Sequence, residues 1–423
     1  MTSNLLNLVE TGVIAKTGAK PKLPTTIPNL TDTMLDVYRI PLKYLYYNNE
    51  NGRISTQIKR IYGNLEPHTD EVDATYNDKI ASYIMEDNAS ALKNTKKSIK
   101  EKSQQVYGYV LQDGRIIDGN RRFTALRQLQ AESGNSQFFE AVILPFTYDA
   151  KADREQIKRL ELAIQMGTEE RLQYDPLDLA VDMYQTIVVE NLMTKKDYAN
   201  ESNKKFKEIE DRIATVELIH DFLDFINAPQ DSYFIVKDAN LYNPLYELAK
   251  KFAKLFPDNG PKYEQTKETA FTLLGKMVQT GGDTVREVRD YLKNIVNSPI
   301  NDEYNDSIEE SIEDFRDKLD DRPITSATDY RNRLEEAMPE IRQVTEVYNQ
   351  TVNRQNRGQS IDNFISDFND ALSTLQDAKR GDGLTGNLHF SNFSKSQIEE
   401  IRDLLIQINL VSGDLIEVYE DEL

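Results

Sequence analysis

The chain contains no cysteine, and only three of its 423 residues are histidines. The absence of cysteine excludes disulfide bonds, thiolate nucleophiles, and zinc or iron–sulfur sites with cysteine ligands. His68, His220 and His389 are too far apart in sequence to predict a local metal motif. No apolar run is long enough to span a bilayer, and the first residues lack the apolar core of a signal peptide. We therefore expect a cytoplasmic protein that does not insert into a membrane.

The net charge of −20 is unevenly distributed along the chain. Residues 301–423 hold 28 acidic and 12 basic side chains, whereas residues 1–300 hold 43 acidic and 39 basic ones. The front of the chain can therefore carry local basic patches, and residues 91–102 contain five lysines and one glutamate. Such a charge run is typical of a solvated helix face, and a rim that attracts phosphate is the alternative.

Hydrophobic periodicity predicts a chain that changes from α+β to helical. Residues 1–33 show little periodicity and are expected to form an N-terminal arm. Residues 34–190 follow as an α+β domain, with strands near 38–48, 107–111, 115–117 and 139–144 and with helices near 76–86 and from Phe123 onward. Residues 191–300 are expected to form a helical domain. Residues 301–423 are expected to form an acidic helical C-terminal domain, which is the natural place for homodimer contacts.

The stretch Asp118-Gly-Asn-Arg-Arg122 lies where the strand pattern passes directly into a helix. A helix N-terminus offers free N–H groups and the positive end of a dipole, so adjacent arginines at this junction suit an anion. Gly119 permits close approach, Arg121 and Arg122 present guanidinium forks, and Asp118 is expected to be the N-cap. The alternative is that both arginines pair with local acids such as Asp118 or Glu140.

Three ordered motifs resemble the ParB N-terminal domain of the ParB/sulfiredoxin-fold group. They are Ile40-Pro-Leu with Asn48 and Arg53, then Gly119-Asn-Arg-Arg-Phe-Thr-Ala125, then Glu170-Arg-Leu-Gln-Tyr-Asp-Pro176. The similarity covers roughly residues 36–190, and a looser likeness to the family's helix-turn-helix region continues to about residue 230. The resemblance implies an α+β ParB/sulfiredoxin-like domain followed by mostly α-helical middle and C-terminal domains.

The resemblance also implies a bound nucleoside triphosphate, CTP or ATP. The residues that it places at the nucleotide are Arg53, Gly119, Asn120, Arg121, Arg122 and Arg171. Where the family carries a Glu-Asn pair that helps to place magnesium, this chain has Gly167-Thr168. The sequence therefore favours nucleotide binding over turnover, and whether the protein is an NTPase stays open. Thr168, Glu169 and Glu170 are candidate Mg²⁺ ligands, or simply an exposed helix start.

Residues 194–199, followed after Lys205 by the helix predicted over residues 206–226, have the proportions of a helix-turn-helix. Its DNA-binding interpretation places four basic side chains against phosphates: Lys204, Lys205, Lys207 and Arg212. Glu208, Glu210 and Asp211 interrupt the same surface. A plain helical scaffold is the alternative.

Three classes of function remain open from the sequence. The favoured one is a ParB-like nucleotide-binding protein, bacterial or phage-related, that couples nucleotide state to DNA association in partition, regulation or a mobile-element role. The second is an enzyme on the same fold, namely a nucleotide-dependent phosphotransferase, NTPase or nuclease. The third is a non-catalytic protein whose acidic C-terminal region mimics DNA or docks a basic partner.

Overall fold

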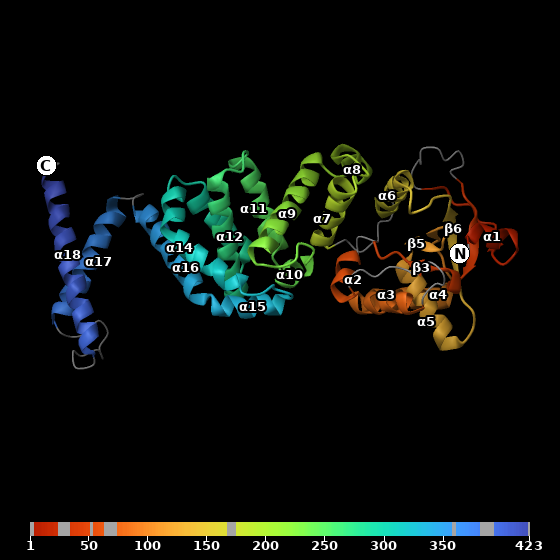
Figure 1. The fold of residues 1–423 in the computed structure, drawn as a ribbon, viewed down its shortest axis with the longest axis horizontal. Coiled ribbons are helices and arrows are strands. Elements are labelled where there is room, and N and C mark those ends of the chain that lie inside the picture. The colour runs from red at the N-terminus through yellow and green to blue at the C-terminus, as the bar shows by residue number, and fades with distance from the viewer. Residues whose placement is uncertain are drawn as a thin grey trace. The chain divides into compact units, whose positions relative to one another are not determined.

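The computed structural model describes residues 4–23, 34–50, 54–62, 74–166, 175–357, 361–380 and 393–421. The chain forms two compact units, Met1–Val347 and Tyr348–Leu423. In the first unit, an α/β part at the N-terminal end is followed by an all-helical part (Figure 1). Within the described residues, no helix is both long enough and apolar enough to cross a membrane.

A six-stranded mixed sheet lies at the centre of the α/β part. Its strands are β1 (Ala15–Lys16), β2 (Val37–Pro41), β3 (Tyr46–Tyr47), β4 (Gly108–Leu111), β5 (Arg115–Asp118) and β6 (Phe138–Leu144). The strand order is β1-β2-β6-β4-β5-β3. Strand β6 runs antiparallel to β2 and parallel to β4, whereas β5 runs antiparallel to β4 and parallel to β3. Both outer strands contain only two residues.

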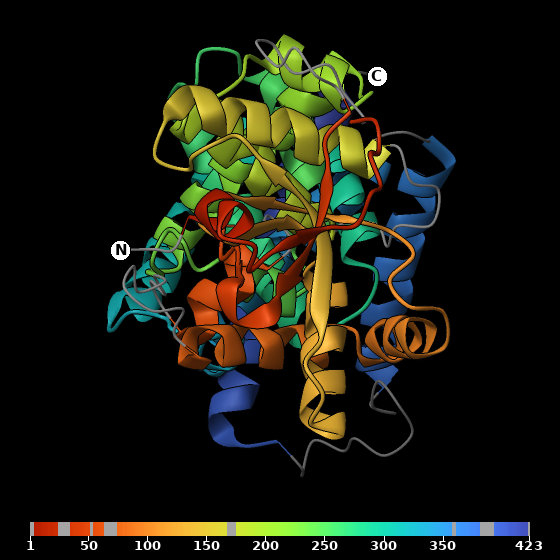
Figure 2. The same cartoon turned by 90° about the vertical axis from the view of Figure 1, so that its right-hand side faces the viewer.

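Helices cover both faces of this sheet (Figure 2). They are α1 (Leu5–Glu10), α2 (Ser55–Tyr62), α3 (Ala74–Asp87), α4 (Ala89–Lys102), α5 (Asn120–Ser133) and α6 (Lys151–Met166), together with the 3₁₀ turn η1 (Leu42–Tyr44). Ile80 of α3 and Phe123 of α5 pack with Ile143 on one face, and Leu160 of α6 packs with Val142 on the other. Because successive strand residues point to opposite faces, a strand covered on both sides is apolar at consecutive positions, as β6 is.

The elements of the α/β part largely agree with the sequence prediction. The strands expected near 107–111, 115–117 and 139–144 are β4, β5 and β6, and the helix expected near 76–86 is α3. The expectation of a loose arm over residues 1–33 is corrected for its described part, which contributes α1 and β1. These elements form because Leu5 and Ile14 are buried in the core beside the sheet.

The helical part is built around one long central helix. Its elements are α7 (Pro176–Tyr184), η2 (Gln185–Val189), α8 (Lys195–Glu201), α9 (Phe206–Phe225), α10 (Tyr233–Asp238), α11 (Tyr242–Leu255), α12 (Pro261–Thr280), α13 (Thr284–Tyr291), η3 (Leu292–Val296), α14 (Asn301–Asp320), α15 (Ala327–Glu336) and α16 (Met338–Arg357). Helix α9 packs against α7, α8, α11 and α12. Its C-terminal half carries an aromatic core in which Phe222 meets Phe271 edge to face, with ring centres 5.4 Å apart.

The first unit extends past residue 300, where the sequence suggested a domain boundary. Phe315 of α14 is fully buried and stacks on Phe225, with 5.9 Å between ring centres. Buried Asn301 and Asn305 both donate to the Thr266 hydroxyl at 3.2 Å. Because α14 supplies both apolar and polar partners to the core, the compact unit continues to Val347.

The second unit consists of the end of α16 and two long helices, α17 (Ile361–Arg380) and α18 (Lys395–Asp421). Large apolar side chains along both helices are exposed: Ile365, Phe368, Leu372, Ile398, Ile401, Leu404, Leu405, Ile406, Ile408, Leu410, Val411, Ile416, Val418 and Tyr419. Their exposed fractions range from 36% to 61%. Within this unit, many apolar side chains of the described helices are therefore uncovered.

Candidate functional site

The junction between β5 and α5 contains the motif that the sequence singled out. Strand β5 ends at Asp118, and α5 begins at Asn120. Between them, Gly119 has a φ of 113° and a ψ of 17°. A side chain is strained in this left-handed region, so the sharp turn from strand to helix depends on glycine.

Packing gives a second reason for glycine at this position. A Cβ atom on Gly119 would lie 2.6 Å from Cζ of Phe139, and one on Gly108 would lie 2.2 Å from the same atom. The Phe139 ring therefore occupies the space that side chains at both positions would need. Sequence reasoning assigned Gly119 to ligand approach and missed this packing role, although Gly108 at the start of a strand was a signal for it.

Arg122 is held by groups of the chain itself. It forms an ion pair with Asp118, with 2.5 Å between Nη2 and Oδ2. Its Nη1 donates to the carbonyl oxygen of Val106 and, at 2.9 Å, to that of Tyr107. Arg122 thus ties the first turn of α5 to the segment that enters β4.

The expectation that Asp118 caps α5 is therefore corrected. The N-cap position is Gly119, and no side chain accepts a cap hydrogen bond there. The Asp118 carboxylate pairs with Arg122 instead, because an arginine four residues ahead lies on the same side of the turn.

The first turn of α5 keeps features that suit a ligand. Asn120 Oδ1 is a buried acceptor with no hydrogen-bond partner among the described residues, which is costly unless another group satisfies it. Arg121 is half-buried on the same turn. Since no side chain caps the helix, its leading N–H groups and dipole favour an anion.

Another arginine, at the opposite end of β5 from this junction, lies close to two tyrosine rings. The Arg115 guanidinium carbon lies 5.5 Å from the ring centre of Tyr46 and 4.1 Å from that of Tyr148. Its Nη1 donates to Asn48 Oδ1 at 3.3 Å, and the Tyr148 hydroxyl donates to Glu50. Arg115 is only 9% exposed, so these contacts fix the loop after β3 against β5.

On the other face of the sheet, one lysine lies close to two carboxylates. Lys158 Nζ lies 2.6 Å from Asp182 Oδ1 and 3.6 Å from Glu161 Oε2. Burial raises the pKa of Glu161 to about 7, and the negative charge of Asp182 acts in the same direction. Asp182 therefore forms the closer ion pair with Lys158, and Glu161 is the carboxyl group that gains a proton near neutral pH. The negative charge of Asp118 at the junction also raises the pKa of Glu161.

Several predicted site residues lie outside the described part of the chain. These are Arg53 and Arg171 of the predicted nucleotide site, together with the candidate Mg²⁺ ligands Thr168, Glu169 and Glu170. Among the described residues, no group of three or more histidine, aspartate or glutamate side chains is arranged to hold a metal ion.

The four predicted DNA-binding residues come together at the start of α9. Lys204 Nζ lies 2.8 Å from Glu208, and Lys207 Nζ lies 3.0 Å from Asp211. Arg212 Nε donates to Glu208 at 3.1 Å. Lys205 is exposed at the N-cap of α9 and makes no ion pair with a described residue.

Helix α9 is buried along most of its length. Ten of its 20 residues are buried, including Ile209, Ile213 and Val216. Only its first turn presents an exposed face of basic residues. Contact with DNA phosphates through this turn is compatible with the burial of α9, whereas the middle of the helix faces the core.

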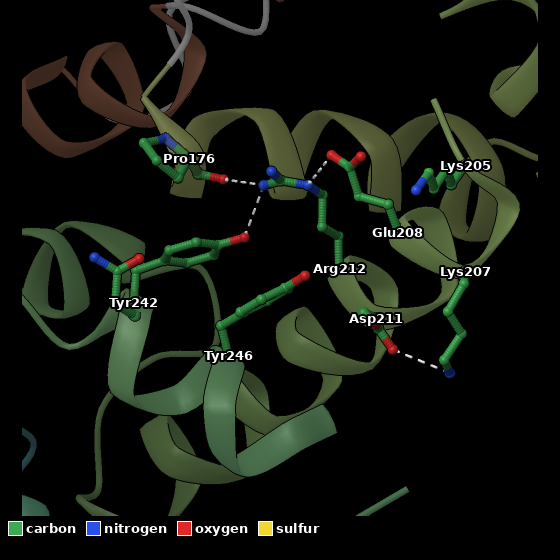
Figure 3. A pocket seen from close by; sticks show the side chains of 9 residues that line it. Pro176, Lys205, Lys207, Glu208, Asp211, Arg212, Tyr242 and Tyr246 are labelled. Atoms are coloured by element: carbon green, nitrogen blue, oxygen red, sulfur yellow. Dashed lines mark hydrogen bonds and ion pairs between the residues drawn. The ribbon is translucent and has the colours of Figure 1, made fainter. Parts of the chain in front are cut away.

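A pocket of about 460 Å³ opens beside this first turn. Its lining residues are Pro176, Lys205, Lys207, Glu208, Asp211, Arg212, Tyr242, Asn243 and Tyr246. Figure 3 shows the two tyrosines on one side, the two lysines on the other and Arg212 between them. Arg212 Nη1 donates to the Pro176 carbonyl oxygen at 3.2 Å and to the Tyr242 hydroxyl at 2.9 Å. The sequence prediction included the basic residues but missed the tyrosines.

No protein-family model matches the chain, and no curated protein matches it. Two solved structures that match are the C-terminally truncated chromosome-partitioning protein ParB from Caulobacter crescentus, one complexed to the centromeric parS site and one complexed with CTP-gamma-S. The first is 12% identical, and the match covers 60% of this chain and 98% of that chain, with a TM-score of 0.31. The second is 14% identical, and the match covers 51% and 98%, with a TM-score of 0.17. Superpositions this loose do not establish family membership.

Proposed function

We propose that this protein is a ParB-like nucleotide-binding protein that couples its nucleotide state to DNA association. The nucleotide is a triphosphate, CTP or ATP, held at the β5–α5 junction with or without Mg²⁺. The proposal rests on the ordered sequence motifs and on the chemistry of this junction. It commits to binding and leaves hydrolysis open.

The observation that carries the proposal is the uncapped start of α5. Gly119 places the helix directly after the strand, and no side chain occupies the cap position. Asn120 adds a buried oxygen that no described residue satisfies, and Arg121 adds a positive charge on the same turn. Together they supply donors for phosphate oxygens and an acceptor for a ligand hydroxyl or amino group.

Within this proposal, the two adjacent arginines have different tasks. Arg122 already has three local acceptors, so its main effect is to fix the shape of the turn. Arg121 carries the direct phosphate contact. Arg53 and Arg171 are proposed to complete the site from the segments on either side.

DNA association is proposed to use the first turn of α9. Lys205 is exposed there. Lys204 and Lys207 form ion pairs with carboxylates, and DNA phosphates can replace these carboxylates as their partners. Contacts of this kind neutralise backbone charge and make binding depend on salt. Sequence-specific readout is not part of the proposal.

Self-association is proposed to use the second unit. Ile398, Ile401, Leu405 and Ile408 of α18 recur at intervals of three and four residues and are all exposed, as in the seam of a helical bundle. A pairing of two copies through α17 and α18 would cover them. Light scattering tests this proposal, because the full chain should have twice the monomer mass and residues 1–347 alone should be monomeric. A monomeric full chain would contradict it.

Calorimetric titration with CTP, ATP, GTP and UTP, with and without Mg²⁺, tests the nucleotide site. We expect one triphosphate to bind and Arg121→Ala to weaken it by roughly ten- to a hundredfold, the usual cost of a charge-assisted contact. Arg39→Ala is the matched control, because Arg39 is an exposed arginine of β2 in the same sheet.

Three results would contradict the proposal. They are the absence of heat with all four triphosphates, equal losses in the Arg121 and Arg39 variants, and a DNA affinity that does not respond to the nucleotide that binds.

A further inference from the structure

The pocket beside α9 has the size of a small-ligand site. Its volume of about 460 Å³ falls within the range of about 300–1,000 Å³ that is usual for ligand pockets. It is formed where α7, α9 and α11 meet. It belongs to the helical part and shares no residue with the β5–α5 junction.

One wall of the pocket is aromatic and held in place. Tyr242 and Tyr246 lie one turn apart on α11, with ring centres 6.1 Å apart and planes inclined by 23°. Arg212 fixes the Tyr242 hydroxyl from across the pocket, and Lys250 lies 5.1 Å from the Tyr246 ring centre. Because these neighbours hold the rings, the wall is preorganised for another planar group.

The opposite side offers donors without partners. Lys205 Nζ has no ion pair with a described residue, and no side chain caps α9. Between the two sides, Arg212 Nη2 makes no hydrogen bond with any described residue, and on the aromatic side the same holds for the side-chain amide of Asn243, which follows Tyr242 on α11. These donors and the positive end of a 20-residue helix favour an anion.

The acidic residues of the lining do not reverse this preference. Glu208 lies between Lys204 and Arg212, and Asp211 pairs with Lys207. With both carboxylates matched, Lys205 and the helix end remain as the uncompensated positive side. A cationic or purely apolar ligand would leave these groups unsatisfied.

We infer that this pocket binds a planar aromatic base that carries a phosphate group. The phosphate lies at the start of α9 near Lys205, and the base lies against the wall of Tyr242 and Tyr246. The ligand is either a free mononucleotide or one exposed nucleotide of a single strand, since both present the same chemistry. This site is separate from the proposed triphosphate site and does not depend on it.

Calorimetry with AMP, adenosine and ribose 5-phosphate tests the inference on the full chain. AMP should bind, and both fragments should bind roughly tenfold or more weakly, because each lacks one of the two recognised groups. Repeating the AMP titration with Arg121→Ala separates the two sites. That change should leave AMP binding within about twofold even if it abolishes triphosphate binding.

Matched variants locate the binding. Tyr246→Ala and Lys205→Ala should each weaken AMP by roughly tenfold or more. Lys254→Ala, an exposed lysine in the last turn of the same α11, should change it by less than about twofold. Adenosine that binds as tightly as AMP, no binding of AMP, or equal effects of all three variants would overturn the inference.

A short oligo(dA) distinguishes the two sources of the ligand. If the single strand binds much more tightly than AMP and loses affinity in the Tyr246 and Lys205 variants, the pocket reads an exposed nucleotide. If AMP binds at least as tightly as the single strand, the pocket is a mononucleotide site. An oligonucleotide that binds equally well to wild type and to both variants would rule out the single strand as the source, and the absence of AMP binding would refute the inference for both sources.

Discussion

Arg60 of α2 forms an ion pair with Asp238 of α10, with 2.7 Å between Nη2 and Oδ2. The same guanidinium carbon lies 5.0 Å from the ring centre of Phe234. Helix α2 begins two residues after Arg53, and α10 belongs to the helical part, so this contact joins the segment next to the proposed nucleotide site to the helices that carry Lys205.

We expect Arg60→Ala to reduce the effect of nucleotide on DNA affinity more than it reduces the stability of the fold. Both side chains are about one-third exposed, so the loss in unfolding free energy should be about 1 kcal/mol or less. The change in DNA affinity on adding nucleotide should shrink, while nucleotide affinity itself stays near wild type. Fluorescence anisotropy on duplex DNA, with and without nucleotide, measures this effect. An unchanged nucleotide response would show that the contact transmits nothing.

Arg122→Ala should destabilise the protein. Its loss leaves Asp118 and two carbonyl groups without their donor, which costs roughly 2–4 kcal/mol. Urea unfolding compares Arg122→Ala with the wild type. Equal unfolding midpoints would mean that Arg122 does not hold the turn in place, and Arg122→Lys should recover only part of the loss because it lacks the fork.

Gly119→Ala should be more destabilising than Gly134→Ala. Both positions have positive φ, but a Cβ at Gly134 has nothing within 4 Å, whereas one at Gly119 meets Phe139. The difference combines the clash with the greater backbone strain of a side chain at φ 113° than at φ 67°, and it should be about 1–3 kcal/mol. Adding Phe139→Leu to Gly119→Ala should recover part of it. A double variant whose losses simply add would contradict the packing role of Phe139.

Glu161→Gln should flatten the dependence of stability on pH. The folded pKa of Glu161 is about 7, above the ordinary value of 4.5. The native state therefore favours the protonated form and loses stability as pH rises from about 4.5 to about 7. Glutamine remains neutral, so its advantage over glutamate should grow across this window by on the order of 3 kcal/mol. Urea unfolding at pH 5, 6, 7 and 8 checks this, and parallel profiles for the two proteins would contradict it.

Truncation should distinguish residue 347 from residue 300 as the end of the folded unit. Residues 1–347 retain Phe315 and Tyr304, which are buried in the core, and should melt in one cooperative transition. Residues 1–300 lack both and leave Phe225 and Phe271 uncovered, which should broaden or abolish the transition. Calorimetry of the two proteins decides, and equally sharp melting of residues 1–300 would place the boundary at 300.

The sequence predicted β4, β5 and β6 well because they are short apolar runs bounded by turn residues such as Gly114. It missed β1, and it predicted one strand near 38–48 where the structure has β2, η1 and β3. It was less informative where tertiary contacts decide. Residues 301–347 are acidic and looked like a separate domain, but the acidic side chains of α14 are exposed to solvent, and buried Ile308 and Phe315 join this helix to the first unit. Charge marks the solvent side of a helix and does not mark a domain boundary.

The same distinction applies to the candidate site. Local sequence was enough to place Asn120 and Arg121 at a strand-to-helix junction, since both follow directly from the pattern. It could not show that Arg122 reaches Val106 and Tyr107, or that Tyr148 covers Arg115, because these partners are 16, 15 and more than 30 positions away. Side-chain roles that depend on such distant partners require the fold.

The sheet ends on both sides in strands of two residues, β1 and β3. A free edge normally invites another chain to add a strand, and this is how many sheet proteins aggregate or form filaments. Here each outer strand is too short to template a ladder, and Lys16 places an exposed charge on one of them. High concentration should therefore not drive growth through backbone pairing of the sheet, and the α/β part should tolerate crowded or locally enriched conditions without forming fibres.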